Sequence, residues 1–164
     1  MIFIPEKKYK EILGVLPIIC VDVLLYSLKE KKFLFLKRTN EPEKNTFCCP
    51  GGRLQKGESL LDGAVREVKE EIGLNLYKKN LECIGVTDTQ FKLSAFENET
   101  YHTINVTFLC NIDSDVNVKL NDEGSEWKWM KGNEEHVSEY VRNAVVQITE
   151  KELVKKSNTL YTTN

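Results

Sequence analysis

The residues between Ser59 and Gly73 define one helix more sharply than any other stretch of this chain. Ser59 followed three residues later by Asp62 is typical of a helix N-terminus, and Gly73 is typical of a C-terminal stop. Apolar residues between them recur at a spacing that places them on one helical face, namely Leu61, Ala64, Val65, Val68 and Ile72. The chain must therefore fold so that this face packs against a core.

Three glutamates share the adjoining face of the same helix. Glu67, Glu70 and Glu71 are separated by one, three and four positions, where like charges repel by roughly a few tenths of a kcal/mol per pair. The last two also lie near the helix C-terminus, where the helix dipole disfavours anions. A solvated acidic face, partly screened by Lys69, is the alternative reading. A divalent cation such as Mg²⁺ would relieve the repulsion, so the pattern predicts a metal site.

The helix forms part of a longer motif with fixed separations. The motif comprises Gly52, Glu58, Arg66-Glu67, Glu70-Glu71 and Gly73, with aliphatic Val68 and Leu74 at two hydrophobic positions. In this order the residues resemble the Nudix box of the Nudix hydrolase family, without a departure from the pattern. The resemblance implies an α+β fold, with a mixed β-sheet sandwiched between α-helices. It also implies an enzyme that hydrolyses a nucleoside diphosphate linked to another group.

The remaining pattern fits one compact domain. A length of 164 residues with 41% hydrophobic residues supports a sizeable core but is short for two domains. We expect a single domain over residues 1–154 and a polar tail over 155–164. Periodicity predicts helices at 6–13 and 134–148, and strands at 17–26, 33–38, 81–91, 101–112 and 126–130.

Composition also excludes several classes of protein. The net charge of -2 argues against a general nucleic-acid binder, although a nucleotide could still be a small substrate. The N-terminus lacks the features of a secretory signal, and Pro17 and Asp22 interrupt the most apolar segment, so we expect a cytoplasmic protein without membrane contact. Five cysteines without a C-x-x-C pair predict reduced thiols. For adjacent Cys48 and Cys49, packing on a strand is favoured over a redox switch.

Outside the motif, a second likeness concerns substrate contacts. Pro17-Ile-Ile-Cys-Val-Asp, Lys37-Arg-Thr-Asn-Glu-Pro and Pro50-Gly-Gly-Arg-Leu-Gln-Lys, together with His102, look like the GDP-mannose mannosyl hydrolase branch of the family. This likeness implies a homodimer and suggests Arg38, Arg53 and His102 as substrate-binding residues. Arginine suits diphosphate oxygens because its donors are planar and permanently charged. A surface or salt-bridged role is the alternative for Arg38 and Arg53, and a plain strand-end position is the alternative for His102.

Two departures from that branch bear on the bond that is cleaved. The mannosyl hydrolases lack one glutamate of each pair and use a loop histidine as base, whereas this chain keeps Glu67 and Glu70 and has no histidine at 120–127. That branch attacks the sugar carbon, while ordinary Nudix enzymes direct water at phosphorus. We therefore expect attack at phosphorus. Cleavage of GDP-mannose at the sugar carbon and a non-catalytic nucleotide-sensing module are the alternatives.

The resemblance also implies a role for each motif residue. Glu67, Glu70, Glu71 and the Gly52 carbonyl are the expected ligands of Mg²⁺, with Mn²⁺ as a substitute. Glu58 is expected to orient the cluster by hydrogen bonding, and Arg66 to orient the carboxylates. The general base is expected to be Glu123 or Glu126, which lie in a loop rich in Asn, Asp and Gly, or one of the motif glutamates.

Overall fold

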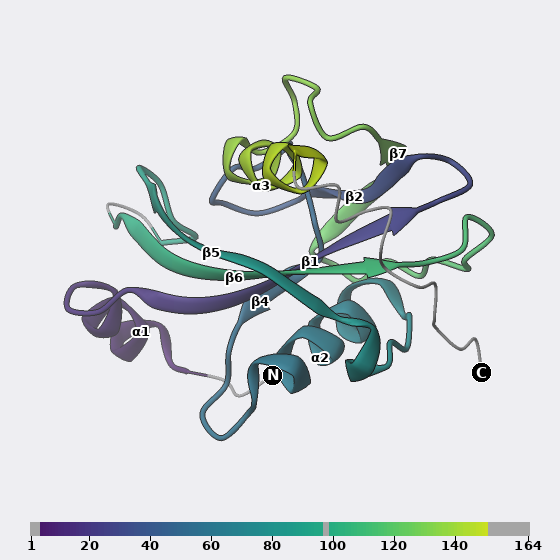
Figure 1. The fold of residues 1–164 in the computed structure, drawn as a ribbon. Helices are drawn as coiled ribbons and strands as arrows, with labels where there is room; N and C mark the ends of the chain where they lie inside the picture. Colours follow the sequence, from purple (N-terminus) through teal and green to yellow (C-terminus); the bar gives the residue numbers. More distant parts are fainter. Residues whose placement is uncertain (1–3, 97–98, 151–164) are drawn as a thin grey trace.

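The computed structural model describes residues 4–96 and 99–150, which form a mixed sheet between helices (Figure 1). In the described part of the chain the sheet has seven strands in the order β3-β2-β1-β6-β5, with β4 paired to β1 and β7 to β2. The strands are β1 (Ile18–Ser27), β2 (Lys32–Arg38), β3 (Phe47–Cys48), β4 (Gly51–Arg53), β5 (Glu82–Phe91), β6 (Tyr101–Asn111) and β7 (Gly124–Met130). The helices are α1 (Glu6–Leu13), α2 (Leu60–Ile72), α3 (Glu139–Glu150) and a 3₁₀ helix (Lys78–Asn80). The expected α+β architecture is therefore confirmed.

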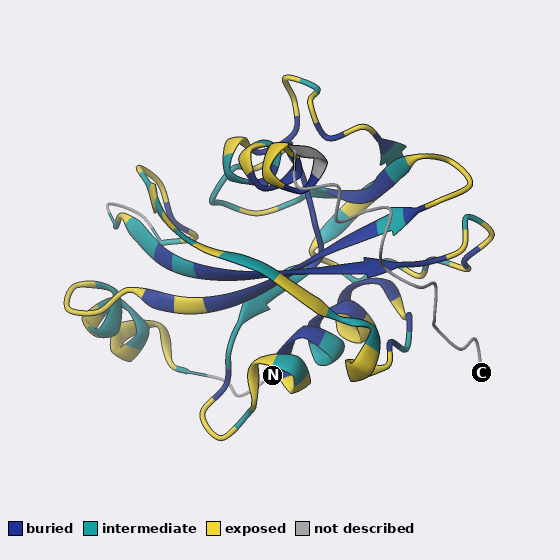
Figure 2. Ribbon diagram, in the orientation of Figure 1, coloured by how far each residue is buried: buried dark blue, intermediate teal, exposed yellow. Residues whose placement is uncertain are grey.

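Central strands β1 and β6 run parallel and carry side chains to both faces of the sheet. On one face, Val21 and Val23 pack with Val68 of α2 in the first core. On the other face, Leu24 packs with Val141 and other residues of α3 in the second core. Figure 1 shows α3 and α2 on opposite sides of the sheet, and Figure 2 shows the dark blue buried strands between them. Burial on both faces explains the nearly continuous apolar run of β1.

Helix α2 has the boundaries that its sequence predicts. The Ser59 hydroxyl accepts a hydrogen bond from the Asp62 amide at 3.1 Å, which caps the N-terminus. Gly73 ends the helix in the left-handed conformation with φ of 75°, where glycine has no side-chain penalty. Ala64, Val68 and Ile72 are fully buried, as the predicted stripe requires.

The last helix begins later than the sequence predicts. Residues 134–138 were expected to be helical, but α3 begins at Glu139. The Phe47 amide donates to the His136 carbonyl and the Ser138 amide donates to the Phe47 carbonyl, both at 2.8 Å. These bonds hold the segment against β3 in an extended bridge, so pairing with the sheet overrides the helical spacing of Val137.

Two further expectations concern the ends of the chain and the membrane. The predicted polar tail at 155–164 lies outside the described residues. Among residues 4–96 and 99–150, no helix is long and apolar enough to cross a membrane.

Candidate active site

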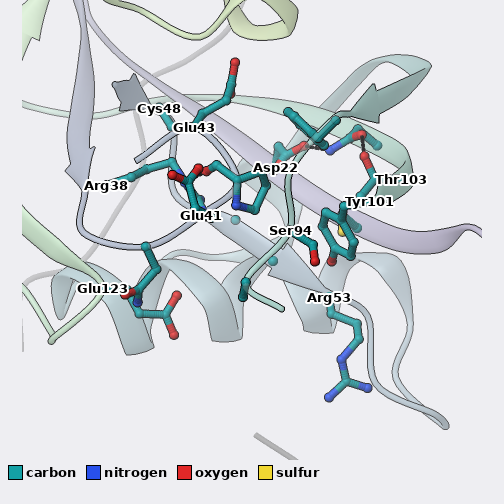
Figure 3. Close-up of a pocket in the computed structure, with 18 of the residues that line it drawn as sticks. Asp22, Arg38, Glu41, Glu43, Cys48, Arg53, Ser94, Tyr101, Thr103 and Glu123 are labelled. Carbon is teal, nitrogen blue, oxygen red and sulfur yellow. Dashed lines mark hydrogen bonds between the residues drawn. The ribbon is translucent and has the colours of Figure 1, made fainter. Parts of the chain in front are cut away.

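A cavity of about 400 Å³ opens between α1, the start of β6, the loop between β2 and β3, and the segment that leads into β4. Figure 3 shows Arg38, Glu41 and Glu123 on one side of it, and Tyr101, Ser94 and Arg53 on the other. Its aromatic lining comprises Tyr9, Phe91, Phe96, Tyr101 and Tyr140, and its acidic lining comprises Asp22, Glu41, Glu43, Glu67 and Glu123. The cavity therefore offers both apolar ring surfaces and charged groups to a ligand.

Helix α2 places two buried carboxylates beside this cavity. Glu67 is 2% exposed and Glu71, one helical turn later, is 8% exposed. Burial raises the pKa of Glu67, and it raises the pKa of Glu71 well above its ordinary value, with Glu67 and Glu123 adding repulsion. A backbone hydrogen bond partly offsets this for Glu71, because the Gly51 amide donates to its Oε2 at 3.3 Å. A cation bound beside Glu67 and Glu71 would therefore be electrostatically favourable.

Arg66 lies among the glutamates of the motif. Its Nε donates to Glu58 Oε1 at 2.5 Å and its Nη2 donates to Glu58 Oε2 at 2.9 Å. Its Nη1 donates to Glu67 at 2.6 Å and to Glu70 at 3.2 Å. The bond from Arg66 lowers the pKa of Glu58, which also accepts from the Gln55 amide. Arg66 does not line the cavity, and its donors bind these carboxylates and the Arg53 carbonyl.

The residues present suit a hard divalent cation. A Cβ on Gly52 would lie 2.8 Å from the Glu67 carboxylate, so only glycine allows the backbone and the carboxylate to approach this closely. In the described part of the chain, no three His, Cys, Asp or Glu side chains make up a group that could hold a metal ion by itself. Mg²⁺ does not require one, because it usually keeps several waters and shares oxygens with substrate phosphates. An oxygen-only donor set beside an open cavity fits that preference.

Arg38 and Glu123 line both the cavity that includes Glu67 and a small pocket next to it that includes Glu71. Arg38 follows an irregularity at the end of β2, and its Nε donates to the Pro42 carbonyl at 2.7 Å. Burial lowers the pKa of Arg38, but nearby Cys48 and Tyr140, followed by Glu71 and Glu123, raise it overall. The Glu123 carbonyl accepts from the Thr39 amide at 3.0 Å, which ties its loop to the loop after β2. Arg38 therefore lies among several carboxylates in this part of the site.

Comparison with known proteins identifies the family. The model described as the NUDIX domain matches residues 17–148. The chain belongs to the Nudix family. An ADP-ribose pyrophosphatase of Methanocaldococcus jannaschii is 35% identical over 106 residues, which cover 65% of this chain and 56% of that protein. The match thus spans little more than half of that relative.

Two further relatives match nearly their whole length. The low-salt glycan biosynthesis protein Agl8 of Haloferax volcanii is 26% identical over 139 residues, which cover 84% of this chain and 86% of that protein. The crystal structure of the MutT protein from Methanosarcina mazei Go1 has a TM-score of 0.66 at 27% identity, covering 83% of this chain and 96% of that one. The Nudix fold expected from the motif is therefore confirmed.

Two residues predicted for this Nudix site lie elsewhere. Tyr101 and Thr103 line the cavity, so alternation along β6 turns His102 to the opposite face, where its Nε2 lies 4.0 Å from Asp88. Glu126 also lies outside the cavity lining and pairs with Lys128 at 2.7 Å. Neither side chain lies in the cavity beside the Nudix glutamates, which are Glu67, Glu70 and Glu71 of α2. Of the two loop glutamates, only Glu123 faces them.

Arg53, the third residue predicted to bind substrate, is intermediate between the predicted residues that lie beside the carboxylates and those that lie outside the cavity. It lines the cavity, but its guanidinium lies 5.6 Å from the centre of the Tyr9 ring. In Figure 3 the side chain points away from Arg38 and Glu123. Arg53 therefore borders the aromatic side of the cavity, apart from the carboxylates.

The structure adds a buried polar chain that sequence reasoning missed. Asn105 Nδ2 donates to Asp22 Oδ2 at 2.7 Å, and Thr103 Oγ1 donates to Asn105 Oδ1 at 2.6 Å. Burial raises the pKa of Asp22 to about 6. All three residues line the cavity. The sequence did contain a sign of this chain. Asp22 is a charged residue within an apolar strand, and Thr103 and Asn105 are polar residues at alternate positions of β6.

Proposed function

We propose that this Nudix protein hydrolyses a nucleoside diphosphate linked to a sugar, with water attacking phosphorus in the presence of Mg²⁺ or Mn²⁺. The observation that carries the proposal is that buried Glu67 lines the cavity and buried Glu71 lines the small pocket next to it, while Arg38 lines both. A diphosphate needs positive partners on more than one side, and a divalent cation on the glutamates would provide the second. The volume of about 400 Å³ is within the range of small-molecule sites.

The aromatic lining and the relatives support the same substrate class. Ring surfaces beside the charged groups suit a ligand with one flat apolar part and one anionic part. The ADP-ribose pyrophosphatase of Methanocaldococcus jannaschii gives further support, because ADP-ribose is a nucleoside diphosphate joined to a sugar.

We assign the roles as follows. Glu67, Glu70, Glu71 and the Gly52 carbonyl are the groups that would hold the cation. The bound cation would neutralise phosphate charge and acidify a water ligand. Glu58 and Arg66 keep the carboxylates in place through the bonds described above.

The substrate-facing groups lie around this centre. Glu123, which faces the Nudix glutamates from a loop, accepts the proton of the attacking water. Arg38 donates to a phosphate oxygen, and Arg53 borders the aromatic side of the cavity.

Replacing Arg38 with alanine should lower kcat/KM by about 10- to 100-fold, which corresponds to about 1.5–3 kcal/mol for a lost hydrogen bond to a charged group. Lysine at the same position should restore only part of the loss, because it keeps the charge without the fork geometry. Arg142→Ala provides the control and should keep the wild-type kcat/KM. Arg142 donates to the Glu135 and Val137 carbonyls outside the cavity. Steady-state kinetics equal to wild type for Arg38→Ala would remove Arg38 from the phosphate site.

A product analysis tests the function itself. Purified protein is incubated with ADP-ribose, GDP-mannose or UDP-glucose, in Mg²⁺ and separately in excess chelator, and the products are separated by ion-exchange chromatography. We expect a nucleoside monophosphate and a sugar phosphate from at least one substrate, only when Mg²⁺ is present. A nucleoside diphosphate and free sugar would instead support the mannosyl hydrolase alternative. Tight binding without any product would support a sensing module.

A further inference from the structure

Two adjacent cysteines form part of the wall of the substrate cavity, a position that the proposed reaction does not use. Cys48 ends β3 and Cys49 follows it, and both line the main cavity and the small pocket next to it. All five cysteines are free, and Cys83 is the exposed one. Cys20 also lines the cavity, but it is placed on β1 and is hydrogen-bonded with Tyr101. The adjacent pair is therefore distinct from the other thiols.

Both cysteines line the same cavity and the same small pocket, although neighbours on a strand normally point apart. The strand ends at Cys48, which frees Cys49 from this alternation. The hydrogen bond from the Cys49 thiol lowers the pKa of Cys48, with burial opposing it, and raises the pKa of Cys49 well above its ordinary value. The Tyr140 hydroxyl lies 2.9 Å from Cys48 Sγ, and nearby Arg38 further favours its thiolate.

Local geometry disfavours a disulfide between these residues. The peptide between Cys48 and Cys49 is trans, and consecutive Cα atoms across a trans peptide lie about 3.8 Å apart. Disulfides usually require Cα atoms about 4.4 Å apart or more, so direct S–S closure would strain the backbone. One soft atom that bonds both sulfurs has no such requirement, because it can bridge two thiols on the same cavity wall without an S–S bond.

We propose that Cys48 and Cys49 form a dithiol site that captures trivalent arsenicals and thereby blocks the substrate cavity. With phenylarsine oxide, both S–H bonds and the arsenic–oxygen bond break, and two sulfur–arsenic bonds form. The two thiol protons leave with the oxide oxygen as one water molecule. Arsenic stays trivalent, so no electrons are transferred. The bound phenyl group lies in the cavity beside Arg38 and excludes the diphosphate; this inhibitory effect rests on the proposed function.

Intact-protein mass spectrometry after treatment with phenylarsine oxide tests the site without any need for turnover. Wild-type protein should retain one phenylarsenic group per chain after washing with 2-mercaptoethanol and should release it to 2,3-dimercaptopropanol. Cys48→Ser and Cys49→Ser should each lose the retained group. Cys20→Ser and Cys83→Ser should keep it, which controls for loss of another cavity thiol and of the exposed thiol. Thermal unfolding of each variant verifies that it is folded.

Different failures have different meanings. Retention of the group by either Cys48→Ser or Cys49→Ser, or its release from wild type by the monothiol, would overturn the dithiol site. If retention follows the predicted pattern, hydrolysis by wild type should fall on treatment and recover with the dithiol. Retention in the predicted pattern by a protein that hydrolyses none of the nucleotide sugars would support the dithiol site and reject the proposed function.

Discussion

Replacing Glu71 with glutamine should reduce turnover of a nucleotide sugar by at least about 100-fold, because a lost metal ligand removes several kcal/mol of transition-state stabilisation. Glutamine has nearly the same shape and can still accept the hydrogen bond from the Gly51 amide. The loss would therefore reflect the missing charge rather than a collapsed site. Glu67→Gln should behave similarly, because Glu67 is buried beside the same cavity.

The same substitution should stabilise the protein when no metal is bound. Burial raises the pKa of Glu71 above its ordinary value of 4.5, so the folded state holds this proton more tightly than the unfolded state does. The metal-free wild type should then lose stability as the pH rises from about 4.5 through the raised pKa. Glu71→Gln lacks this ionisation, so its advantage should be small below pH 4.5 and largest at neutral pH.

Thermal unfolding in excess chelator, measured between mildly acidic and neutral pH, checks this expectation. Glu71→Gln should have the higher unfolding midpoint at neutral pH, and the two curves should converge on acidification. Added Mg²⁺ should raise the midpoint of wild type more than that of the variant. Full turnover by Glu71→Gln, or a variant less stable than metal-free wild type at neutral pH, would contradict the assignment of this carboxylate to the metal site.

The second large effect should separate the two loop glutamates. Glu123→Gln should lower kcat by about 100- to 10,000-fold, the usual contribution of a positioned general base. The Glu123 backbone amide donates a hydrogen bond to the Asn121 side chain, and the Glu123 carbonyl accepts one from the Thr39 amide. Neither bond involves the Glu123 carboxylate, so the loop should keep its conformation in the variant. Glu126→Gln is a matched control, three residues away, with its carboxylate paired to Lys128 outside the cavity lining.

Steady-state kinetics of both variants at saturating substrate and Mg²⁺ provide the measurement. We expect a low kcat for Glu123→Gln and values near wild type for Glu126→Gln. Near-normal kcat for Glu123→Gln would assign proton transfer to a Nudix glutamate. A selective loss in Glu126→Gln would mean that the loop moves far enough to exchange the two carboxylates.

Local chemistry explains why the sequence predicts α2 so well. Ser59, Gly73 and the apolar stripe act within one helix, so their effect depends little on the rest of the chain. The spacing of Glu67 and Glu71 likewise fixes their common direction once the helix forms. Motif and helix together were enough to predict the family and one side of the cavity.

The other side of the cavity depends on long-range pairing, which periodicity does not specify. Alternation along β6 predicts two faces but not which one borders the cavity, and the structure places Tyr101 and Thr103, not His102, in the cavity lining. Cys48 and Cys49 can line the same cavity because β3 ends at Cys48. The late start of α3 depends on hydrogen bonds to Phe47, a partner distant in sequence.

The most direct test of the account is hydrolysis in ¹⁸O-labelled water, using a nucleotide sugar that the protein turns over with Mg²⁺. Attack at phosphorus, favoured by the intact pairs Arg66-Glu67 and Glu70-Glu71, predicts that the label enters a phosphate of the nucleoside monophosphate or the sugar phosphate. Mass spectrometry of the separated products locates it. Label found only in the anomeric hydroxyl of free sugar, with an unlabelled nucleoside diphosphate, would contradict attack at phosphorus and establish cleavage at the sugar carbon.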